Sequence, residues 1–179
     1  MRIIAGYLKG RIFDSPKSEQ THPMSDKIRG ALFNILGDIE GLHVLDGFAG
    51  SGAIAFEALS RGAATATLIE SDRAAQLAII SNIHKLGLEK TATLVKTGIN
   101  AWLLASEAKF DIVILDPPYD DLQVNLVISM ADRTKPNGIL ALSLPPRAEI
   151  NLPTSNYEIL STKSYGDAQL RLYRRNETD

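Results

Sequence analysis

Apolar and polar residues along this chain follow a repeating order, in which short apolar runs are separated by segments with helical spacing. The apolar runs that favour β-strands lie at residues 44–46, 66–70, 92–96, 110–116 and 139–144. Buried strands that alternate with helices are typical of a parallel sheet covered by helices on both faces. The pattern therefore predicts an α/β domain with a mostly parallel, twisted sheet.

The two ends of the chain depart from this alternation. Residues 2–13 read as two short strands around a turn, which predicts a small N-terminal β-hairpin with basic side chains on its open face. Residues 157–163 and 169–174 flank a Gly-Asp turn and predict a C-terminal antiparallel hairpin. We therefore expect residues 1–24 to form a basic hairpin and loop extension, and residues 25–179 to form the α/β domain.

Two helices are marked by their end residues. Ser25 begins the first helix and Gly37 ends it. Its apolar residues form one stripe at helical spacing, namely Ile28, Ala31, Leu32, Ile35 and Leu36. The helix after Asp72 is predicted to carry, on its inward face, Leu77, Ile80 and either Ile83 or His84.

Composition limits the class of protein. The chain has 179 residues, of which 45% are hydrophobic and 22% charged, as in an ordinary globular domain. No apolar run approaches the roughly 18 residues that cross a bilayer, and the N-terminus does not resemble a signal peptide. The absence of cysteine excludes disulfides and thiolate metal sites. We expect a cytoplasmic protein that binds neither a membrane nor a metal.

Charge is unevenly distributed along the chain. The net charge is −2, but residues 1–35 contain six Lys or Arg and three Asp or Glu. A basic leading segment indicates a local surface for a polyanion such as nucleic acid. So small an excess also fits an ordinary solvated face.

A loop of small residues follows the first strand of the predicted α/β domain. Asp46 ends the strand, and Gly47 to Gly52 lead into a helix. This arrangement holds nucleotide-type ligands in open α/β sheets, because glycines let the backbone approach the ligand and the helix amides face it. The spacing is not G-x-G-x-x-G, so the loop by itself also fits a plain tight turn.

An acidic residue ends the second strand of the predicted domain. Glu70 stands 24 positions after Asp46, where a carboxylate can accept two hydrogen bonds from a ribose diol. The alternative is that Glu70 caps the following helix, although Ser71 and Asp72 supply a better cap.

The most specific motif is Asp116-Pro117-Pro118-Tyr119, directly after a buried strand. The prolines hold the backbone extended and leave few amide donors, so the Asp116 carboxylate and the Pro117 carbonyl can accept both hydrogens of one –NH₂ group. Tyr119 offers a flat face on which a nucleobase can stack. Gripping both hydrogens lets the nitrogen rehybridise and aim its lone pair at an electrophile. A structural Asp-Pro-Pro turn with a packed tyrosine is the alternative.

These two loops resemble those of the S-adenosylmethionine-dependent amino-methyltransferases. Along nearly its whole length the chain is similar to the bacterial 16S ribosomal RNA guanine-N2 methyltransferase family, of the RsmD type. The further segments that carry this resemblance are Arg2–Gly6, Lys9–Arg11, Pro23–Arg29, Ala31–Asn34, Glu57–Ala63, Glu70, Asn82 and Tyr165–Asp167. The resemblance implies a Rossmann-like methyltransferase fold.

The resemblance also implies a set of functional residues. The cofactor would be S-adenosylmethionine, released as S-adenosylhomocysteine, with no metal. Its binding residues would be Asp46, Phe48, Ala49, Gly50, Ser51, Gly52, Glu70, Ser71, Gly98, Ile99 and Asp116. The catalytic residues would be Asp116 and Pro117, which hold the target amine, and Tyr119, which stacks on the guanine. The residues that contact RNA phosphates would be Lys9, Arg11, Lys27 and Arg29. The expected partner is 16S rRNA or the assembling small ribosomal subunit, bound by a monomer.

The chain departs from the family pattern at several positions. The family usually has Arg-Pro-Thr at His22-Pro23-Met24, a glutamate at Gly30, a bulky residue at Gly47 and an acidic or amide side chain at Gly98. At Gly98 the contact with the adenine amino group is lost or passes to Asn100, which would lower the affinity for the cofactor.

Three other functions remain open from the sequence. The same chemistry could act on DNA adenine or on a protein glutamine, although no further DNA-recognition domain fits within this length. The chain could instead be a non-catalytic rRNA-binding assembly factor with a decayed cofactor site, an interpretation suggested by Gly30 and Gly98.

Overall fold

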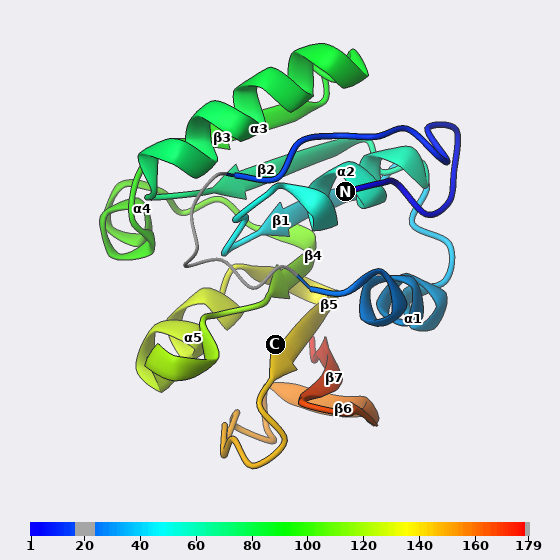
Figure 1. Cartoon of the computed structure of the whole chain (residues 1–179). Helices are drawn as coiled ribbons and strands as arrows, with labels where there is room; N and C mark the ends of the chain where they lie inside the picture. Colours follow the sequence, from blue (N-terminus) through cyan, green and yellow to red (C-terminus); the bar gives the residue numbers. More distant parts are fainter. Residues whose placement is uncertain (17–23, 178–179) are drawn as a thin grey trace.

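The computed structural model describes residues 1–16 and 24–177, which form one seven-stranded sheet with helices on both faces (Figure 1). The strand order is β3-β2-β1-β4-β5-β7-β6. The strands are β1 His43–Asp46, β2 Thr65–Ile69, β3 Ala92–Val95, β4 Phe110–Leu115, β5 Thr134–Leu144, β6 Tyr157–Tyr165 and β7 Ala168–Arg175. β1 to β5 are parallel, and β7 runs antiparallel to both of its neighbours. The predicted fold class is confirmed.

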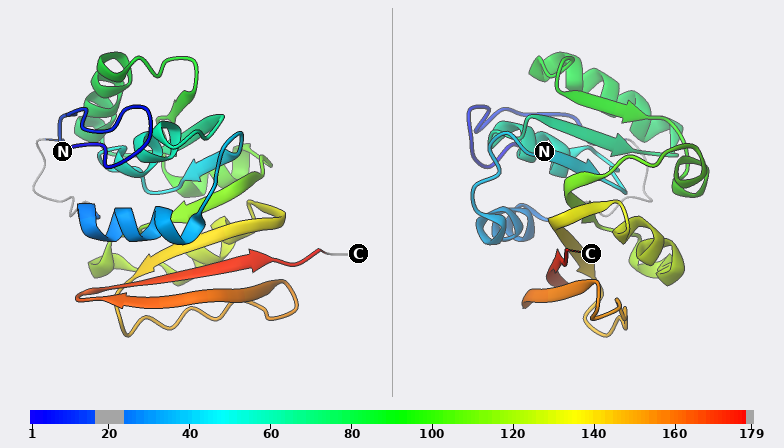
Figure 2. Two further views of the ribbon diagram at one scale, coloured as in Figure 1. Left: turned by 90° about the vertical axis from the view of Figure 1, so that its right-hand side faces the viewer. Right: turned by 180° about the vertical axis from the view of Figure 1, so that it is seen from behind.

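The helices divide the apolar core between the two faces of the sheet (Figure 2). Their bounds are α1 Asp26–Leu36, α2 Ala53–Ser60, α3 Arg73–Leu86, α4 Ile99–Ala105 and α5 Val124–Ala131, with the 3₁₀ helix η1 at Tyr119–Asp121. One core cluster holds Leu32 of α1, Phe56 of α2 and Ile79 of α3. The other holds Trp102 of α4 and Met130 of α5. Both faces of the parallel strands are therefore dry, which explains their nearly unbroken apolar sequence.

The order of the strands reverses direction at β1. From β1 the chain proceeds outward to β2 and β3, then returns to β4 on the other side of β1. In open α/β sheets, such a switch point leaves a crevice at the carboxyl ends of the two strands, where ligands bind. Asp46 is the last residue of β1, and Asp116 directly follows β4. The switch point therefore brings the two loops singled out in the sequence to one edge of the sheet.

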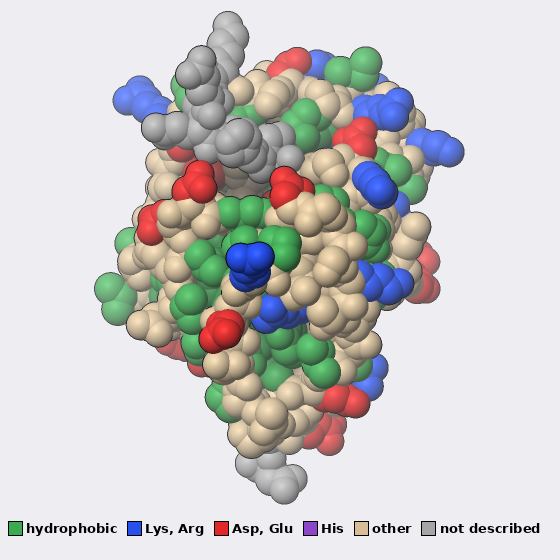
Figure 3. Space-filling view, turned by 60° about the horizontal axis from the view of Figure 1, so that its bottom comes forward, with side chains coloured by type: hydrophobic (Ala, Val, Ile, Leu, Met, Phe, Trp, Pro, Cys, Tyr) green, Lys and Arg blue, Asp and Glu red, His purple; other side chains and the backbone are tan. Residues whose placement is uncertain are grey.

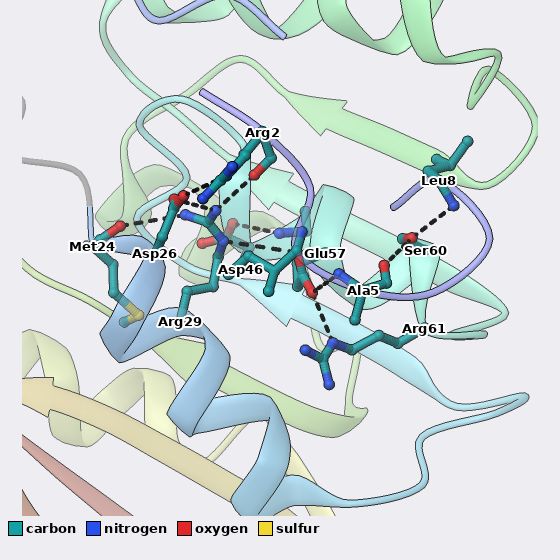
Figure 4. Close-up of polar contacts among 12 residues, drawn as sticks. Arg2, Ala5, Leu8, Met24, Asp26, Arg29, Asp46, Glu57, Ser60 and Arg61 are labelled. Carbon is teal, nitrogen blue, oxygen red and sulfur yellow. Dashed lines mark hydrogen bonds and ion pairs between the residues drawn. The ribbon is translucent and has the colours of Figure 1, made fainter. Parts of the chain in front are cut away.

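The N-terminal segment is fixed to α2 by buried polar side chains (Figure 4). Glu57 is fully buried, and its carboxylate accepts the amides of Ile4 at 2.7 Å and Ala5 at 3.0 Å. Ser60 accepts the Leu8 amide and donates to the Ala5 carbonyl. These contacts satisfy backbone groups that would otherwise be buried without partners.

The two predicted N-terminal strands pair only at the antiparallel β-bridge between Arg2 and Ile12, and neither continues as a named strand. The side chains of Ile3, Leu8 and Phe13 enter the same core cluster as α2. The division of the chain at residue 24 stays a prediction, since the described residues 1–16 share this core.

The predicted ends of α1 are confirmed. Of the predicted inward face of α3, Ile83 does pack against the core, but Leu77 and Ile80 do not. The Ser25 side chain accepts the Ile28 amide at the start of α1, and Gly37 ends it. In α3, Leu77 and Ile80 are exposed. The buried residues of α3 are Ala75, Ile79, Asn82 and Leu86. Asn82 turns inward because its amide side chain binds both the N–H and the carbonyl of Asp14.

The predicted C-terminal hairpin is confirmed. Tyr165 pairs with Ala168 across the two-residue turn Gly166-Asp167. Gly166 has a φ of 61°, a backbone conformation that glycine adopts without steric cost. Within residues 1–16 and 24–177, no helix has the length and apolar character needed to cross a membrane.

Candidate active site

Asp46 lies at the centre of the candidate site. Its side chain is fully buried, and its Oδ2 accepts the amide of Ala55, in the first turn of α2, at 3.2 Å. Its Oδ1 is also buried and has no hydrogen-bond partner among the described residues. The pKa of Asp46 is raised to about 8, chiefly by burial; the negative charges of Asp116 and Glu70 act in the same direction, and the Ala55 hydrogen bond opposes them. A ligand with a positive charge would lower this pKa, and a ligand with an N–H or O–H donor would give Oδ1 a hydrogen-bond partner.

Two glycines make the loop after Asp46 compact. A Cβ on Gly47 would lie 2.5 Å from Leu115 Cδ2, so the departure from the family's bulky residue is matched by close packing against β4. Gly52 has a φ of 79°, and a Cβ there would lie 2.8 Å from the Phe56 ring. The loop therefore passes directly from β1 into the N-terminus of α2, whose amides point toward the strand end.

Glu70 ties the glycine loop to the next helix. Its Oε2 accepts the Gly50 amide at 2.7 Å, and its Oε1 accepts the Asp72 amide at 2.7 Å. Asp72 itself caps α3 by accepting the Ala75 amide. Glu70 thus supports the loop, and each carboxylate oxygen keeps a lone pair for a further donor. Its role toward a ribose stays a prediction.

The Asp-Pro-Pro-Tyr loop is held by a residue of β5. The hydroxyl of Tyr119 lies 2.8 Å from Ser143 Oγ. Burial raises the pKa of Asp116 to about 6, against a hydrogen bond from Ser143 that lowers it. Tyr119 is half-buried, and its pKa is raised mainly by burial and further by the charges of Asp116 and Asp167. Asp116 is therefore mostly ionised at neutral pH, while Tyr119 keeps its proton.

The carboxyl end of β3 leads to Gly98 and Ile99. Gly98 precedes α4 without a side-chain cap, and a Cβ at this position would meet no atom within 4 Å. A cleft of about 530 Å³ lies between Asn100, two residues after Gly98, and the segment that carries Leu122 and Val124. Asn100 is exposed and lines this cleft, as an adenine contact there would require. That contact stays a prediction.

The remaining predicted cofactor residues follow the course of the three loops. Ala49 and Ser51 are buried, and Phe48 and Gly50 are partly exposed. Ser71 is exposed at the start of α3, and Ile99 is buried at the start of α4. Among the described residues, no group of three or more His, Cys, Asp or Glu is arranged to hold a metal ion. His22 and Pro23 lie outside the described residues.

The prediction that Arg29 contacts RNA phosphates is wrong. Its side chain is fully buried, and its guanidinium donates to the Asp26 carboxylate and to the carbonyls of Arg2 and Met24 (Figure 4). It also lies 3.9 Å from the Glu57 carboxylate. A guanidinium buried in this way serves the attachment of the N-terminal segment, because its Nη1 and Nη2 groups donate to the protein itself and none of it is exposed.

The other predicted RNA-binding residues remain exposed. Lys9, Arg11 and Lys27 all have exposed side chains. The loop with Lys9 and Arg11 contacts the C-terminal end of α2, which is about 12 Å from the glycine loop at its N-terminus. On the face drawn in Figure 3, Lys and Arg among the described residues are interspersed with Asp and Glu. An RNA contact by these residues stays a prediction.

Three polar residues of the site and its support were given no role by the sequence reasoning, although two of them lie in the Glu57–Ala63 segment that carries the family resemblance. Ser143, Glu57 and Ser60 each lie in apolar segments and are at most 2% exposed. A lone polar residue inside a buried strand or helix is the pattern that could have identified them, because such a group requires a partner.

Comparisons with known proteins agree with this geometry. The family model described as conserved hypothetical protein 95 matches residues 1–174. The ribosomal RNA small subunit methyltransferase D of Escherichia coli K12 is 36% identical over 182 residues, covering 98% of this chain and 90% of the relative. The protein of the same name from Haemophilus influenzae is 31% identical, covering 97% and 93%.

Solved structures show the same architecture. The Escherichia coli protein yhhF aligns with a TM-score of 0.86 and 33% identity over 99% of both chains. The structure of SMU.776 in complex with SAH aligns with a TM-score of 0.65 over 83% of this chain and 48% of that one. At 16% identity, this second likeness shows the fold alone.

Proposed function

The chain belongs to the conserved hypothetical protein 95 family, which includes the ribosomal RNA small subunit methyltransferase D proteins, and from this we propose that it methylates ribosomal RNA. The proposed reaction transfers a methyl group from S-adenosylmethionine to the exocyclic N2 amino group of a guanine in 16S rRNA. The substrate would be that RNA or the assembling small ribosomal subunit. The observation that carries the proposal is the meeting of the Asp46 and Asp116 loops at the switch point between β1 and β4.

The residues at the glycine loop fit the proposed cofactor. S-adenosylmethionine, when bound, supplies a methyl group activated by a positively charged sulfonium. Its α-amino group and ribose hydroxyls are donors, and Asp46 has a buried acceptor oxygen without a partner among the described residues. Gly47 and Gly52 bring the backbone close to the strand end, and Glu70 lies next to the loop. Because burial raises the pKa of Asp46 to about 8, a cationic cofactor beside it would favour its ionised form and gain an attractive interaction that a neutral cofactor lacks.

The Asp116 loop fits the proposed target. Asp116 and the Pro117 carbonyl would accept the two hydrogens of the guanine amine, which turns the nitrogen lone pair toward the methyl group. Tyr119 would hold the base by stacking on its ring. As the nitrogen–carbon bond forms and the carbon–sulfur bond breaks, the nitrogen must lose a proton. Asp116 is ionised at neutral pH and can accept it.

The base must leave its stack to reach this pocket, at a cost of a few kcal/mol. An unpaired guanine in RNA is therefore the favoured substrate. The alternatives are methylation of a DNA adenine or of a protein glutamine. Identification of the methylated product decides between them and the guanine. For a non-catalytic assembly factor, we expect no S-adenosylmethionine binding by calorimetry at millimolar cofactor. Binding is favoured by the acidic side chains of Asp46, Glu70 and Asp116, whose charges influence one another.

The test of the proposal is methyl transfer to 16S rRNA isolated from cells that lack the gene. Radiolabel from S-adenosylmethionine should enter one guanine, identified as N2-methylguanine by nucleoside mass spectrometry. Asp116→Ala should lose turnover by roughly 10²–10⁴-fold while keeping its cofactor affinity. Asp120→Ala, which removes an exposed carboxylate of the same loop, is the matched control and should keep activity. Incorporation that persists in Asp116→Ala would show that the grip on the amine is misassigned.

A further inference from the structure

The turn between β6 and β7 belongs to a motif to which the proposed function assigns no role. The segment Tyr165–Asp167 carries part of the family resemblance and contains this turn. Because Leu144, the last residue of β5, pairs with Gln169 of β7, the turn lies beyond the carboxyl end of β5. The Asp-Pro-Pro-Tyr loop follows the parallel strand β4 at the same edge of the sheet. The motif is therefore at the edge where the target base would bind.

One row of paired residues links Tyr119 to the outermost strand, β6. The Tyr119 hydroxyl lies 2.8 Å from Ser143 Oγ on β5. Ser143 is opposite Leu170 of β7, and Leu170 is opposite Lys163 of β6. Directly opposed residues of antiparallel strands project from the same face of a sheet. With neighbouring strands about 4.8 Å apart, the Cα atoms of Ser143 and Lys163 are about 10 Å apart. The Lys163 side chain therefore starts close to the Tyr119 hydroxyl and on the same face.

Tyr165 lies on this face too. It follows Lys163 by two residues, and side chains two positions apart in a strand share a face. Tyr165 packs against the core cluster that contains Leu170, yet part of it remains exposed. Lys163 is exposed. Two tyrosines and one lysine thus gather on one face of the sheet at the edge of the candidate site.

The cleft considered for adenine lies on the opposite face of the sheet. It is lined by Asn100 of α4 and by Leu122, in front of α5, and these two helices cover that face. On the face of Tyr119, α1 lies beside β5 and β7, and α1 begins at the end of the sheet where β6 turns into β7 (Figure 2, left). Lys27, in the first turn of α1, is exposed and adds a second positive charge there. A polyanion therefore has its complementary charges on the α1 side, away from the adenine cleft.

We propose that Tyr165 and Lys163 bind the RNA nucleotide next to the extruded guanine, with the Tyr165 ring stacked on its base and the Lys163 ammonium paired with its phosphate. This proposal rests on the proposed function, because it takes RNA as the substrate. Aromatic rings beside basic side chains are the usual means by which proteins bind single-stranded nucleic acid. Asp167 is exposed in the turn and repels a phosphate, so the RNA backbone passes over Lys163 and not over the turn.

The first experiment measures the affinity of Tyr165→Leu and Tyr165→Phe for 16S rRNA from cells that lack the gene, without S-adenosylmethionine. Leucine keeps an apolar side chain against the core but has no ring, whereas phenylalanine keeps the ring. Loss of one stacked base weakens binding by roughly fivefold to a hundredfold. We expect this loss in Tyr165→Leu only, with the affinity for S-adenosylmethionine unchanged in both variants. Equal RNA affinity of both variants, whether high or low, would overturn the stacking of a base on Tyr165.

Lys163→Gln tests the phosphate contact at an exposed position, where the substitution does not disturb the core. The slope of log affinity against log salt concentration should become shallower by about 0.7, the value for one phosphate of a single strand. Lys90→Gln is the matched control, because Lys90 is exposed between α3 and β3, at the opposite edge of the sheet. It should keep the wild-type slope. An unchanged slope in Lys163→Gln would overturn the phosphate contact.

Methyl transfer by the same variants separates this inference from the proposed function. In Tyr165→Leu, the RNA concentration that gives half the maximal single-turnover rate should rise by the same factor as the dissociation constant, while the rate at saturating RNA is kept. Variants that methylate and bind RNA like the wild type would leave the proposed function intact and overturn this inference. A wild type that binds RNA through Tyr165 and Lys163 but transfers no methyl group would support this surface and refute the proposed function.

Discussion

Replacing Gly6 by alanine should detach the N-terminal segment from α2. Gly6 has a φ of +81°, and a Cβ there would lie 1.7 Å from the Ser60 carbonyl oxygen and 2.2 Å from its carbon. Both atoms belong to the backbone of a helix end, so no side-chain rotation can relieve the clash. The segment must therefore move away from Ser60.

The size of the effect follows from the contacts that this movement breaks. The amides of Tyr7 and Leu8 donate to the Ser60 carbonyl and hydroxyl at 2.8 and 3.0 Å, and the Ser60 hydroxyl donates to the Ala5 carbonyl at 2.5 Å. Three hydrogen bonds are worth about 3 kcal/mol in net stability, and the left-handed backbone conformation adds about 1 kcal/mol for alanine. Exposing the Leu8 side chain adds about 2 kcal/mol. The expected loss is about 6 kcal/mol, a large part of the stability of a typical domain.

Gly10→Ala is the matched control for this prediction. Gly10 has a φ of +82°, but a Cβ there would meet no atom within 4 Å. Replacing Gly10 by alanine should lower the free energy of unfolding only by the cost of the left-handed backbone conformation, about 1 kcal/mol. Urea unfolding of both variants measures the difference in the free energy of unfolding. If Gly6→Ala is no less stable than Gly10→Ala, the packing of Gly6 against Ser60 does not hold the segment in place.

Three further predictions concern the candidate site. The rate of methyl transfer should fall as the pH drops through about 6, because the pKa of Asp116 is raised to that value and protonation removes an acceptor for the amine; a single-turnover pH profile that stays flat from pH 5 to 8 would contradict this. Neutralising Lys9 and Arg11 together should weaken RNA binding and reduce its dependence on salt concentration, and an unchanged salt slope would remove their loop from the interface. Gly98→Asp should tighten S-adenosylmethionine binding, because the position is open and an aspartate there could both cap α4 and accept from the adenine amino group; calorimetry with no gain in affinity would place the adenine elsewhere.

Local sequence was sufficient for much of the fold. The ends of α1 follow from Ser25 and Gly37, and the last hairpin follows from its Gly166-Asp167 turn. These features depend on hydrogen bonds and backbone angles within a few residues, so a single sequence encodes them directly. The loops at Asp46 and Asp116 could be singled out for the same reason, since each is a strand end with a distinctive run of residues.

The environment of individual side chains could not be obtained in this way. Arg29 looked like an exposed basic residue of α1, yet it is buried because Asp26 and the carbonyl of Arg2 receive its guanidinium. The inward face of α3 was misjudged because Leu77 and Ile79 lie on different sides of the helix. Only the packing of the helix on the sheet decides which of these sides is buried.

The sequence by itself therefore predicted the succession of strands and helices along the α/β domain and singled out the two loops. Only the tertiary structure decided that Arg29 is buried and that Ser143 lies within hydrogen-bonding distance of Tyr119. The physical reason is distance along the chain. Periodicity and capping act over a few residues, whereas burial and hydrogen bonding between residues 24 to 68 positions apart depend on how the whole sheet packs.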